Sequence, residues 1–115
     1  MCGIFSLLNG REEGISDEII NESFNKGKKR GPEYSELKKV EDNLLFGFHR
    51  LAINGIDDNS NQPMCIDGII LICNGEIYNY KELFSFMKII PSTKSDCEVI
   101  IHLYKHYGLD YLLQL

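Results

Sequence analysis

The segment CGIFSLL, residues 2–8, follows the first methionine directly and holds mostly apolar, strand-forming residues. The next two residues are Asn9-Gly10, a dipeptide typical of tight turns. The sequence therefore predicts a strand over residues 2–8 that ends at this turn. Because a cysteine stands at the start of that strand, Cys2 bears on function as well as on fold.

Helical and extended patterns occupy separate blocks after this strand. Ser16 is an N-cap candidate followed by two carboxylates, Asp17 and Glu18, which favours a helix that ends before Gly31-Pro32. Strands and helices that do not alternate regularly indicate the α+β class. The other expected elements are a strand over residues 44–53, a loop over 54–63, a strand buried on both faces over 68–73, and helices over 80–89 and 97–107.

The last of these helices has its own start signal. Ser95 and Glu98 are spaced as a capping box, in which each side chain bonds the backbone N–H of the other residue. Gly108 is expected to end the helix. The helical period places four residues on the inward face: Val99, Ile100, Leu103 and Tyr107.

Composition and charge exclude several classes of protein. The 115 residues suit one domain, and 43% hydrophobic with 25% charged residues is ordinary for a globular chain. Twelve Lys and Arg against seventeen Asp and Glu give a net charge of −5, which argues against a nucleic acid partner. No apolar run is long enough to span a bilayer and no signal peptide is evident, so we expect no membrane association and a cytoplasmic location.

Cys2 can combine two chemical roles. If Met1 is removed, the residue carries both a thiol and a free α-amine, and such an amine titrates near ~7.7–8.0. The amine can then accept the thiol proton, so that one residue supplies both the nucleophile and its base. The alternative is that Cys2 is a small apolar strand residue.

A series of motifs adds weight to the catalytic interpretation. Six motifs follow one another along the chain: Cys2-Gly3-Ile4-Phe5, Arg30-Gly31-Pro32, His49-Arg50-Leu51-Ala52-Ile53, Gln62-Pro63, Asn74-Gly75-Glu76-Ile77-Tyr78-Asn79, and Ser95-Asp96-Cys97-Glu98-Val99-Ile100. With these motifs in this order, the sequence resembles the class II glutamine amidotransferases, the N-terminal-nucleophile glutaminases, and most of all the glutaminase half of glutamine-hydrolysing asparagine synthetase. The resemblance implies a four-layer αββα sandwich of two sheets between helices.

The resemblance also implies the reaction. Cys2 would attack the side-chain amide of L-glutamine, release ammonia for asparagine synthesis, and leave a thioester that water hydrolyses to glutamate. Both steps pass through an oxyanion that needs fixed hydrogen-bond donors. Asn74 and Gly75 suit this role as a side-chain amide and a backbone N–H. The alternative is that Asn74-Gly75 is only a tight turn.

Glutamine is a zwitterion, so its amino-acid end calls for one cation and one anion. Arg50 offers a planar fork for the α-carboxylate, and Asp96 offers a carboxylate for the α-ammonium. Without the resemblance, Arg50 could be a solvated or paired strand-end residue, and Asp96 could compensate a helix dipole. The remaining expected substrate contacts are Leu51, Ala52, Ile53, Asn54 and Glu76.

Other reactive side chains receive structural interpretations. His49 is a candidate base beside Cys2, but the amine already serves and strand histidines are usually structural, so we expect a structural role. His102 and His106 are spaced as a metal pair but lack an evident third ligand, so no metal site is expected. Cys65, Cys73 and Cys97 are expected to be buried small residues rather than redox centres.

The family's glutaminase domain is longer than this chain. We therefore expect residues 1–115 to be a glutaminase domain that is incomplete on its C-terminal side, without a synthetase domain. ATP and Mg would belong to that absent domain, so no cofactor is expected here. The expected partners are L-glutamine and, beyond it, a synthetase domain or subunit or a second copy. Two alternatives stay open: a non-catalytic glutamine-binding or interaction module, and a thiol redox protein that uses Cys2.

Overall fold

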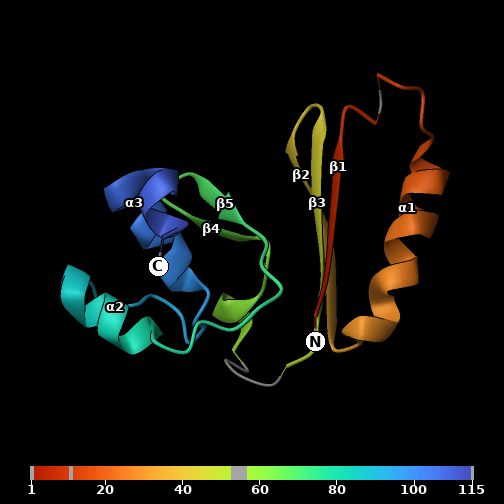
Figure 1. The fold of residues 1–115 in the computed structure, drawn as a ribbon. Helices are drawn as coiled ribbons and strands as arrows, with labels where there is room; N and C mark the ends of the chain where they lie inside the picture. Colours follow the sequence, from red (N-terminus) through yellow and green to blue (C-terminus); the bar gives the residue numbers. More distant parts are fainter. Residues whose placement is uncertain (1, 11, 53–56, 115) are drawn as a thin grey trace.

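The computed structural model describes residues 2–10, 12–52 and 57–114. It is a mixed α/β structure with antiparallel sheets, in agreement with the predicted α+β class (Figure 1). None of the helices in the described ranges is long and apolar enough to cross a membrane. The elements are β1 (Gly3–Leu8), α1 (Asp17–Asn25), the 3₁₀ helix η1 (Lys26–Arg30), β2 (Tyr34–Glu41), β3 (Leu44–Arg50), the 3₁₀ helix η2 (Asp58–Ser60), β4 (Met64–Ile66), β5 (Ile69–Leu71), α2 (Tyr80–Met87) and α3 (Glu98–Leu112).

A three-stranded antiparallel sheet and α1 form one half of the molecule, here called the sheet lobe. Its strands lie in the order β1-β3-β2, with β3 hydrogen-bonded on both sides. The helix α1 begins at Ser16, whose side chain accepts a hydrogen bond from the Ile19 N–H at 3.3 Å, as predicted. It covers one face of the sheet (Figure 1) and places the Phe24 ring edge-on against Phe5, with centroids 5.9 Å apart.

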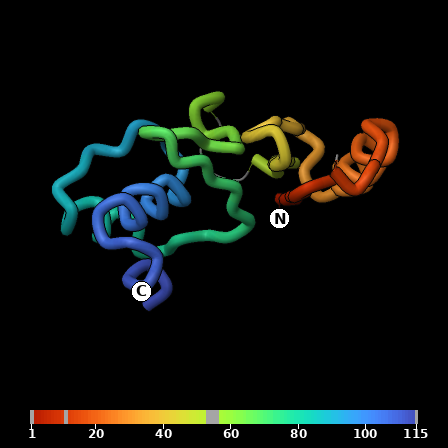
Figure 2. The backbone as a smooth tube through the Cα atoms, turned by 90° about the horizontal axis from the view of Figure 1, so that it is seen from above, coloured from red at the N-terminus to blue at the C-terminus, as the bar shows by residue number. Residues whose placement is uncertain are grey.

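The second half, the helix lobe, contains the short β4–β5 hairpin together with α2 and α3. Its core is formed by Phe84 of α2 and by Val99 and Leu103 of α3, all of which are almost fully buried. The two lobes lie side by side with β4 and β5 on the side of the sheet opposite α1 (Figures 1 and 2). The radius of gyration is 15.1 Å, against about 13 Å for a compact domain of this length, so the lobes form an elongated body.

Two strands were not predicted. β2 is a charged strand with Lys38, Lys39 and Glu41, and its sequence lacks a strong alternation of apolar and polar residues. β4 has only three residues and follows a loop-rich segment. Both form because a partner strand supplies backbone hydrogen bonds, and this tertiary effect is stronger than local propensity.

Other expectations were wrong in detail. The strand predicted over residues 68–73 is shorter, over Ile69–Leu71, and is half-buried in a two-stranded sheet rather than buried on both faces. Cys65, which was expected to be buried, is exposed on β4. The helix expected to run to Arg30 changes to a 3₁₀ helix at Lys26, where the small Gly27 lies against the His49 ring.

α3 also differs from its prediction. Gly108 ends the first helical segment as expected, because its backbone is not helical (φ 78°, ψ 177°), but a second short helical segment follows directly and extends α3 to Leu112. The Ser95 hydroxyl accepts from the Cys97 N–H at 3.3 Å rather than from Glu98, so the capping box is absent. Ile101 is buried, whereas Tyr107 is 42% exposed, because the helix packs with a rotated face against α2 and β5.

Candidate active site

A cavity of about 370 Å³ lies between the two lobes and has the size of a small-molecule site. The sheet lobe contributes Cys2, Phe48, Arg50 and Leu51 to its lining. The helix lobe contributes three segments: the one before β4, the loop after β5 and the one before α3. The residues from these segments are Ser60, Gln62, Cys73, Asn74, Gly75, Glu76, Tyr78, Ser95, Asp96 and Cys97.

Cys2 lies at the start of β1, where the register pairs Gly3 with His49 of β3. The backbone N–H of Leu51 points at the Cys2 Sγ atom at 3.4 Å, and the Sγ atom lies 3.7 Å from the Leu51 carbonyl oxygen. Arg30 donates from Nε to the carbonyl oxygen of Cys2 at 3.3 Å. These contacts on both sides of the residue fix the orientation of its thiol at the edge of the cavity.

Arg50 is the last residue of β3 and is 7% exposed. Its Nη1 donates to the Asp57 carbonyl oxygen at 3.1 Å and to the Asn61 side-chain oxygen. The turn over residues 57–61 therefore holds the guanidinium plane against the cavity. A planar fork in a fixed orientation is suited to a carboxylate.

The loop over residues 73–77, here called the Asn-Gly loop, has no regular secondary structure but is anchored at both ends. The buried side chain of Gln62 accepts a hydrogen bond from the Cys73 N–H. Asp96 accepts one from the Ile77 N–H at 2.6 Å. Between these anchors Asn74 and Gly75 line the cavity and are exposed, so their donors are open to a ligand.

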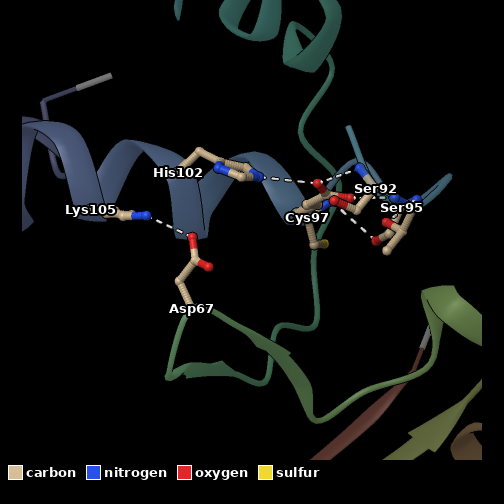
Figure 3. Close-up of polar contacts among 8 residues, drawn as sticks. Asp67, Ser92, Ser95, Cys97, His102 and Lys105 are labelled. Atoms are coloured by element: carbon tan, nitrogen blue, oxygen red, sulfur yellow. Dashed lines mark hydrogen bonds and ion pairs between the residues drawn. The ribbon is translucent and has the colours of Figure 1, made fainter. Parts of the chain in front are cut away.

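The segment that carries Asp96 depends on a buried carboxylate. Glu98 is fully buried and accepts hydrogen bonds from the Ser92 N–H at 2.8 Å, the Thr93 N–H at 2.6 Å and His102 Nε2 at 3.1 Å. Figure 3 shows two of these donor residues, Ser92 and His102. Burial raises the pKa of Glu98, but these hydrogen bonds favour the ionised form more strongly and hold its pKa below the usual value. An ionised Glu98 therefore shapes the turn before α3.

Two further thiols lie in the cavity. The neighbouring thiol of Cys97 lowers the pKa of Cys73 to about 7. The neighbouring thiol of Cys73, together with burial, raises the pKa of Cys97. The Cys97 thiol lies 3.8 Å from the carbonyl oxygen of Gly75 in the Asn-Gly loop.

His49 has a structural role in the sheet lobe. It is 1% exposed, stacks on Phe24, and its Nε2 lies 2.8 Å from the Phe24 carbonyl oxygen. Because a carbonyl only accepts, Nε2 carries the proton, and Nδ1 therefore accepts from the Ser35 hydroxyl at 2.7 Å. Both ring nitrogens are engaged, which agrees with the structural interpretation of this histidine.

The structure brings together residues that are far apart in the sequence. Of the predicted site residues, Cys2, Arg50, Leu51, Asn74, Gly75, Glu76 and Asp96 line the cavity. Ala52 is half-buried and does not line it. Ile53 and Asn54 lie outside the described residues.

Sequence reasoning missed the residues that hold the site in place. Gln62 anchors the Asn-Gly loop, Asn61 orients Arg50, and Arg30 contacts the backbone of Cys2. A signal for two of them was present, because Gln62-Pro63 and Arg30-Gly31-Pro32 are among the matching motifs. For Asn61 there was no signal, since its loop carries several similar polar residues.

The described part of the chain contains no group of three or more His, Cys, Asp or Glu residues that could hold a metal ion. His102 bonds Glu98, and His106, one helical turn further on, is exposed. The cavity itself brings together a thiol (Cys2), a guanidinium (Arg50) and a carboxylate (Asp96), which are groups suited to acyl transfer and to recognition of a small zwitterion.

Known proteins are similar to this chain in sequence. Residues 1–115 match the family model of a glutamine amidotransferase domain. Asparagine synthetase [glutamine-hydrolyzing] 1 of Arabidopsis thaliana is 38% identical over 97% of this chain and 20% of its own length. Asparagine synthetase [glutamine-hydrolyzing] 2 of Bacillus subtilis is 34% identical over 97% of this chain and 16% of its own length. The chain thus spans about a fifth of the length of these curated relatives.

Proposed function

The chain belongs to the glutamine amidotransferase domain family, and from this premise we propose that it hydrolyses L-glutamine to glutamate and ammonia through a thioester on Cys2. The observation that carries the proposal is the convergence of Cys2, Arg50, Asn74 and Asp96 on one cavity. Two of these residues come from each lobe. A nucleophile, a cation, an amide donor and an anion are the groups that cleavage of a zwitterionic amide requires.

In the proposed reaction the Cys2 thiol gives its proton to a base, the resulting thiolate attacks the amide carbon of glutamine, and the base passes the proton to the departing amide nitrogen, which leaves as ammonia. The α-amine of Cys2, freed by removal of Met1, serves as the base. The Asn74 side chain and the Gly75 N–H donate to the oxyanion in both the acylation and the hydrolysis step. His49 takes no part, because both of its ring nitrogens are already bonded inside the sheet lobe.

Recognition of the amino-acid end is assigned to opposite charges. Arg50 binds the α-carboxylate through its guanidinium fork, and Asp96 binds the α-ammonium with help from Glu76. Leu51, Ala52, Ile53 and Asn54 are proposed as further contacts. Asp96 has a second task, since one of its oxygens already accepts from the Ile77 N–H, so it links recognition to the placement of the Asn-Gly loop.

The destination of the ammonia follows from the relatives. The curated relatives are named as glutamine-hydrolysing asparagine synthetases and are about five times longer than this chain. We infer that residues 1–115 are a glutaminase domain whose ammonia passes to a synthetase domain or subunit, which would be the part that binds ATP and Mg. Across the molecule, Figure 1 shows α1, then the three-stranded sheet, then the β4–β5 hairpin, then α2 and α3. This succession supports the proposed four-layer sandwich. The cytoplasm is the location that we propose for the domain.

The experiment is glutamate release by the purified chain, combined with its intact mass. Wild-type protein should begin at Cys2, release glutamate from glutamine, and gain the mass of one electrophilic glutamine analogue. Cys2→Ala should lose at least about 10⁴-fold in rate, because the nucleophile is gone. Cys65→Ser is the matched control, since Cys65 is exposed and does not line the cavity.

Two results would contradict the proposal. Retention of Met1 in a turnover-competent preparation would remove the proposed base. Binding of glutamine without turnover by the wild type would instead identify a non-catalytic glutamine-binding module.

A further inference from the structure

Arg50 and Asp96 lie on different segments of the chain, yet recognition of one small zwitterion requires a defined spacing between them. The turn over residues 57–61 holds Arg50, and the segment over residues 92–96 carries Asp96. A contact between these two segments therefore determines how far apart the two charged groups lie.

Ser60 makes such a contact. It is the last residue of η2, is 5% exposed and lines the cavity. Its Oγ atom lies 3.2 Å from the backbone nitrogen of Lys94, two residues before Asp96. The same hydroxyl is hydrogen-bonded to a carboxylate oxygen of Asp57, and the Ser60 N–H donates to that oxygen at 3.1 Å. One hydroxyl group thus joins the turn that holds Arg50 to the segment that carries Asp96.

The direction of these hydrogen bonds follows from their chemistry. A backbone N–H only donates, so the Ser60 oxygen accepts from Lys94 and gives its own proton to Asp57. The bond from Ser60 is the main cause that lowers the pKa of Asp57, and the charges of Lys94 and Arg50 act in the same direction. Asp57 is therefore ionised at neutral pH, and an ionised acceptor strengthens the bond from the hydroxyl.

Loss of this hydroxyl would affect the spacing more than the groups themselves. The Lys94 N–H would lose its acceptor at Ser60, which weakens the connection between the segment and the turn. The Arg50 contacts to the Asp57 carbonyl oxygen and to Asn61 involve other atoms and would remain. Each charged group would therefore persist, but the distance between them would no longer be fixed.

We propose that Ser60 is a positioning residue that fixes the spacing between Arg50 and Asp96 and so makes the site selective for α-amino acid amides. The inference rests on the proposed function, since it takes these two residues as the groups that bind the charges of glutamine. A ligand with both charges binds well only when the two groups are correctly spaced, whereas a ligand with one charge does not sense the spacing. Because its proton is given to Asp57, Ser60 acts through the two segments rather than on the ligand.

The experiment measures dissociation constants by NMR titration of the Cys2→Ala chain, which lacks the nucleophile and so cannot turn glutamine over. The ligands are L-glutamine, glutaramate, which lacks the α-ammonium, and 4-aminobutanamide, which lacks the α-carboxylate. Adding Ser60→Ala should weaken L-glutamine binding about 10-fold and the binding of either analogue less than about 2-fold. Ser92→Ala is the matched control and should leave all three constants unchanged, because Ser92 is exposed in the same segment and bonds Glu98 through its backbone N–H.

A second measurement needs no substitution at Ser60. The exchange rate of the Lys94 amide hydrogen with solvent reports on its hydrogen bond to Ser60. L-Glutamine, which binds Arg50 and Asp96 at once, should hold the two segments together and slow this exchange by about 5-fold or more. Glutaramate and 4-aminobutanamide should leave the rate unchanged.

Three results would overturn the proposal. They are an unchanged constant for L-glutamine in Ser60→Ala, equal weakening of all three ligands, which would assign Ser60 a general structural role, and equal slowing of Lys94 exchange by all three. Failure of the chain with Ser60 intact to bind L-glutamine would instead contradict the proposed function itself. A wild-type chain that binds glutamine without turnover would contradict the thioester chemistry but would leave this result standing.

Discussion

The two lobes hold their site residues by different means. Cys2 and Arg50 are fixed in the sheet lobe by the backbone ladder between β1 and β3, which sets Gly3 opposite His49. In the helix lobe, the Asn-Gly loop and Asp96 lie in irregular segments. The side chains of Gln62, Asp96 and Glu98 accept hydrogen bonds from backbone N–H groups and so hold these segments in place.

The difference indicates where each lobe is vulnerable. A strand ladder spreads its stability over many backbone bonds, so that single exposed side chains matter little. A loop held by a few buried polar side chains loses its shape when one of them is removed, because the remaining donors are left unsatisfied. We therefore expect the two lobes to differ in three measurements: the reaction rate, the effect of added side-chain volume on stability, and the pH dependence of stability.

Asn74→Ala should have the largest effect and should act on rate alone. It removes one proposed oxyanion donor, so kcat should fall about 10²–10³-fold while KM and the melting temperature change little. The matched control is Asn79→Ala, because Asn79 is exposed at the start of α2 and makes no side-chain cap hydrogen bond. An unchanged kcat in Asn74→Ala would assign Asn74-Gly75 to a turn without a catalytic role.

A pair of glycine variants compares packing in the two lobes. At Gly31 an added Cβ would lie 2.3 Å from the carbonyl oxygen of His49 and 2.4 Å from the carbonyl carbon of Arg50. These are backbone atoms of β3, so Gly31→Ala should lower the free energy of unfolding by about 1–3 kcal/mol in urea denaturation.

At Gly75 the nearest neighbour of an added Cβ is the Cys73 sulfur, at an ordinary 3.8 Å. Gly75→Ala should therefore change the free energy of unfolding by less than about 0.5 kcal/mol. Equal destabilisation by both variants would contradict the contrast between a tightly packed strand end and an open loop.

Glu98→Gln tests the polar support of the helix lobe. An amide NH₂ in place of one oxygen faces a backbone N–H, so the free energy of unfolding should fall by about 1–2 kcal/mol at neutral pH. Because the folded-state pKa of Glu98 is lowered, its stabilisation is present above the ordinary pKa of glutamate and is lost as the pH falls through the lowered value. The difference between variant and wild type should therefore shrink in acid.

Melting temperatures measured from neutral to acidic pH check this expectation. Glu82→Gln is the control, because Glu82 is likewise in the first turn of a helix, α2, but is exposed. A difference between Glu98→Gln and wild type that stays constant over this range would show that ionisation of Glu98 does not support the turn before α3.

Several elements could be predicted because their signals are local. Ser16 caps α1 as expected, and the helix carries Asp17 and Glu18 in its first turn. The β2 strand could not be predicted, because its charged sequence becomes extended only against β3. The buried face of α3 was predicted partly wrong, since contacts with α2 and β5 decide which side of the helix is covered.

The sequence alone determined the kinds of chemistry available. It places a cysteine at position 2, Arg50 at the end of one strand and Asn74-Gly75 after a second strand, in an order that resembles one family. Only the tertiary structure decided which of these groups share a cavity and what holds them there. The reason is physical: residue type and local propensity act over a few residues, whereas the hydrogen bonds of Gln62 with Cys73 and of Asp96 with Ile77 depend on how distant segments pack.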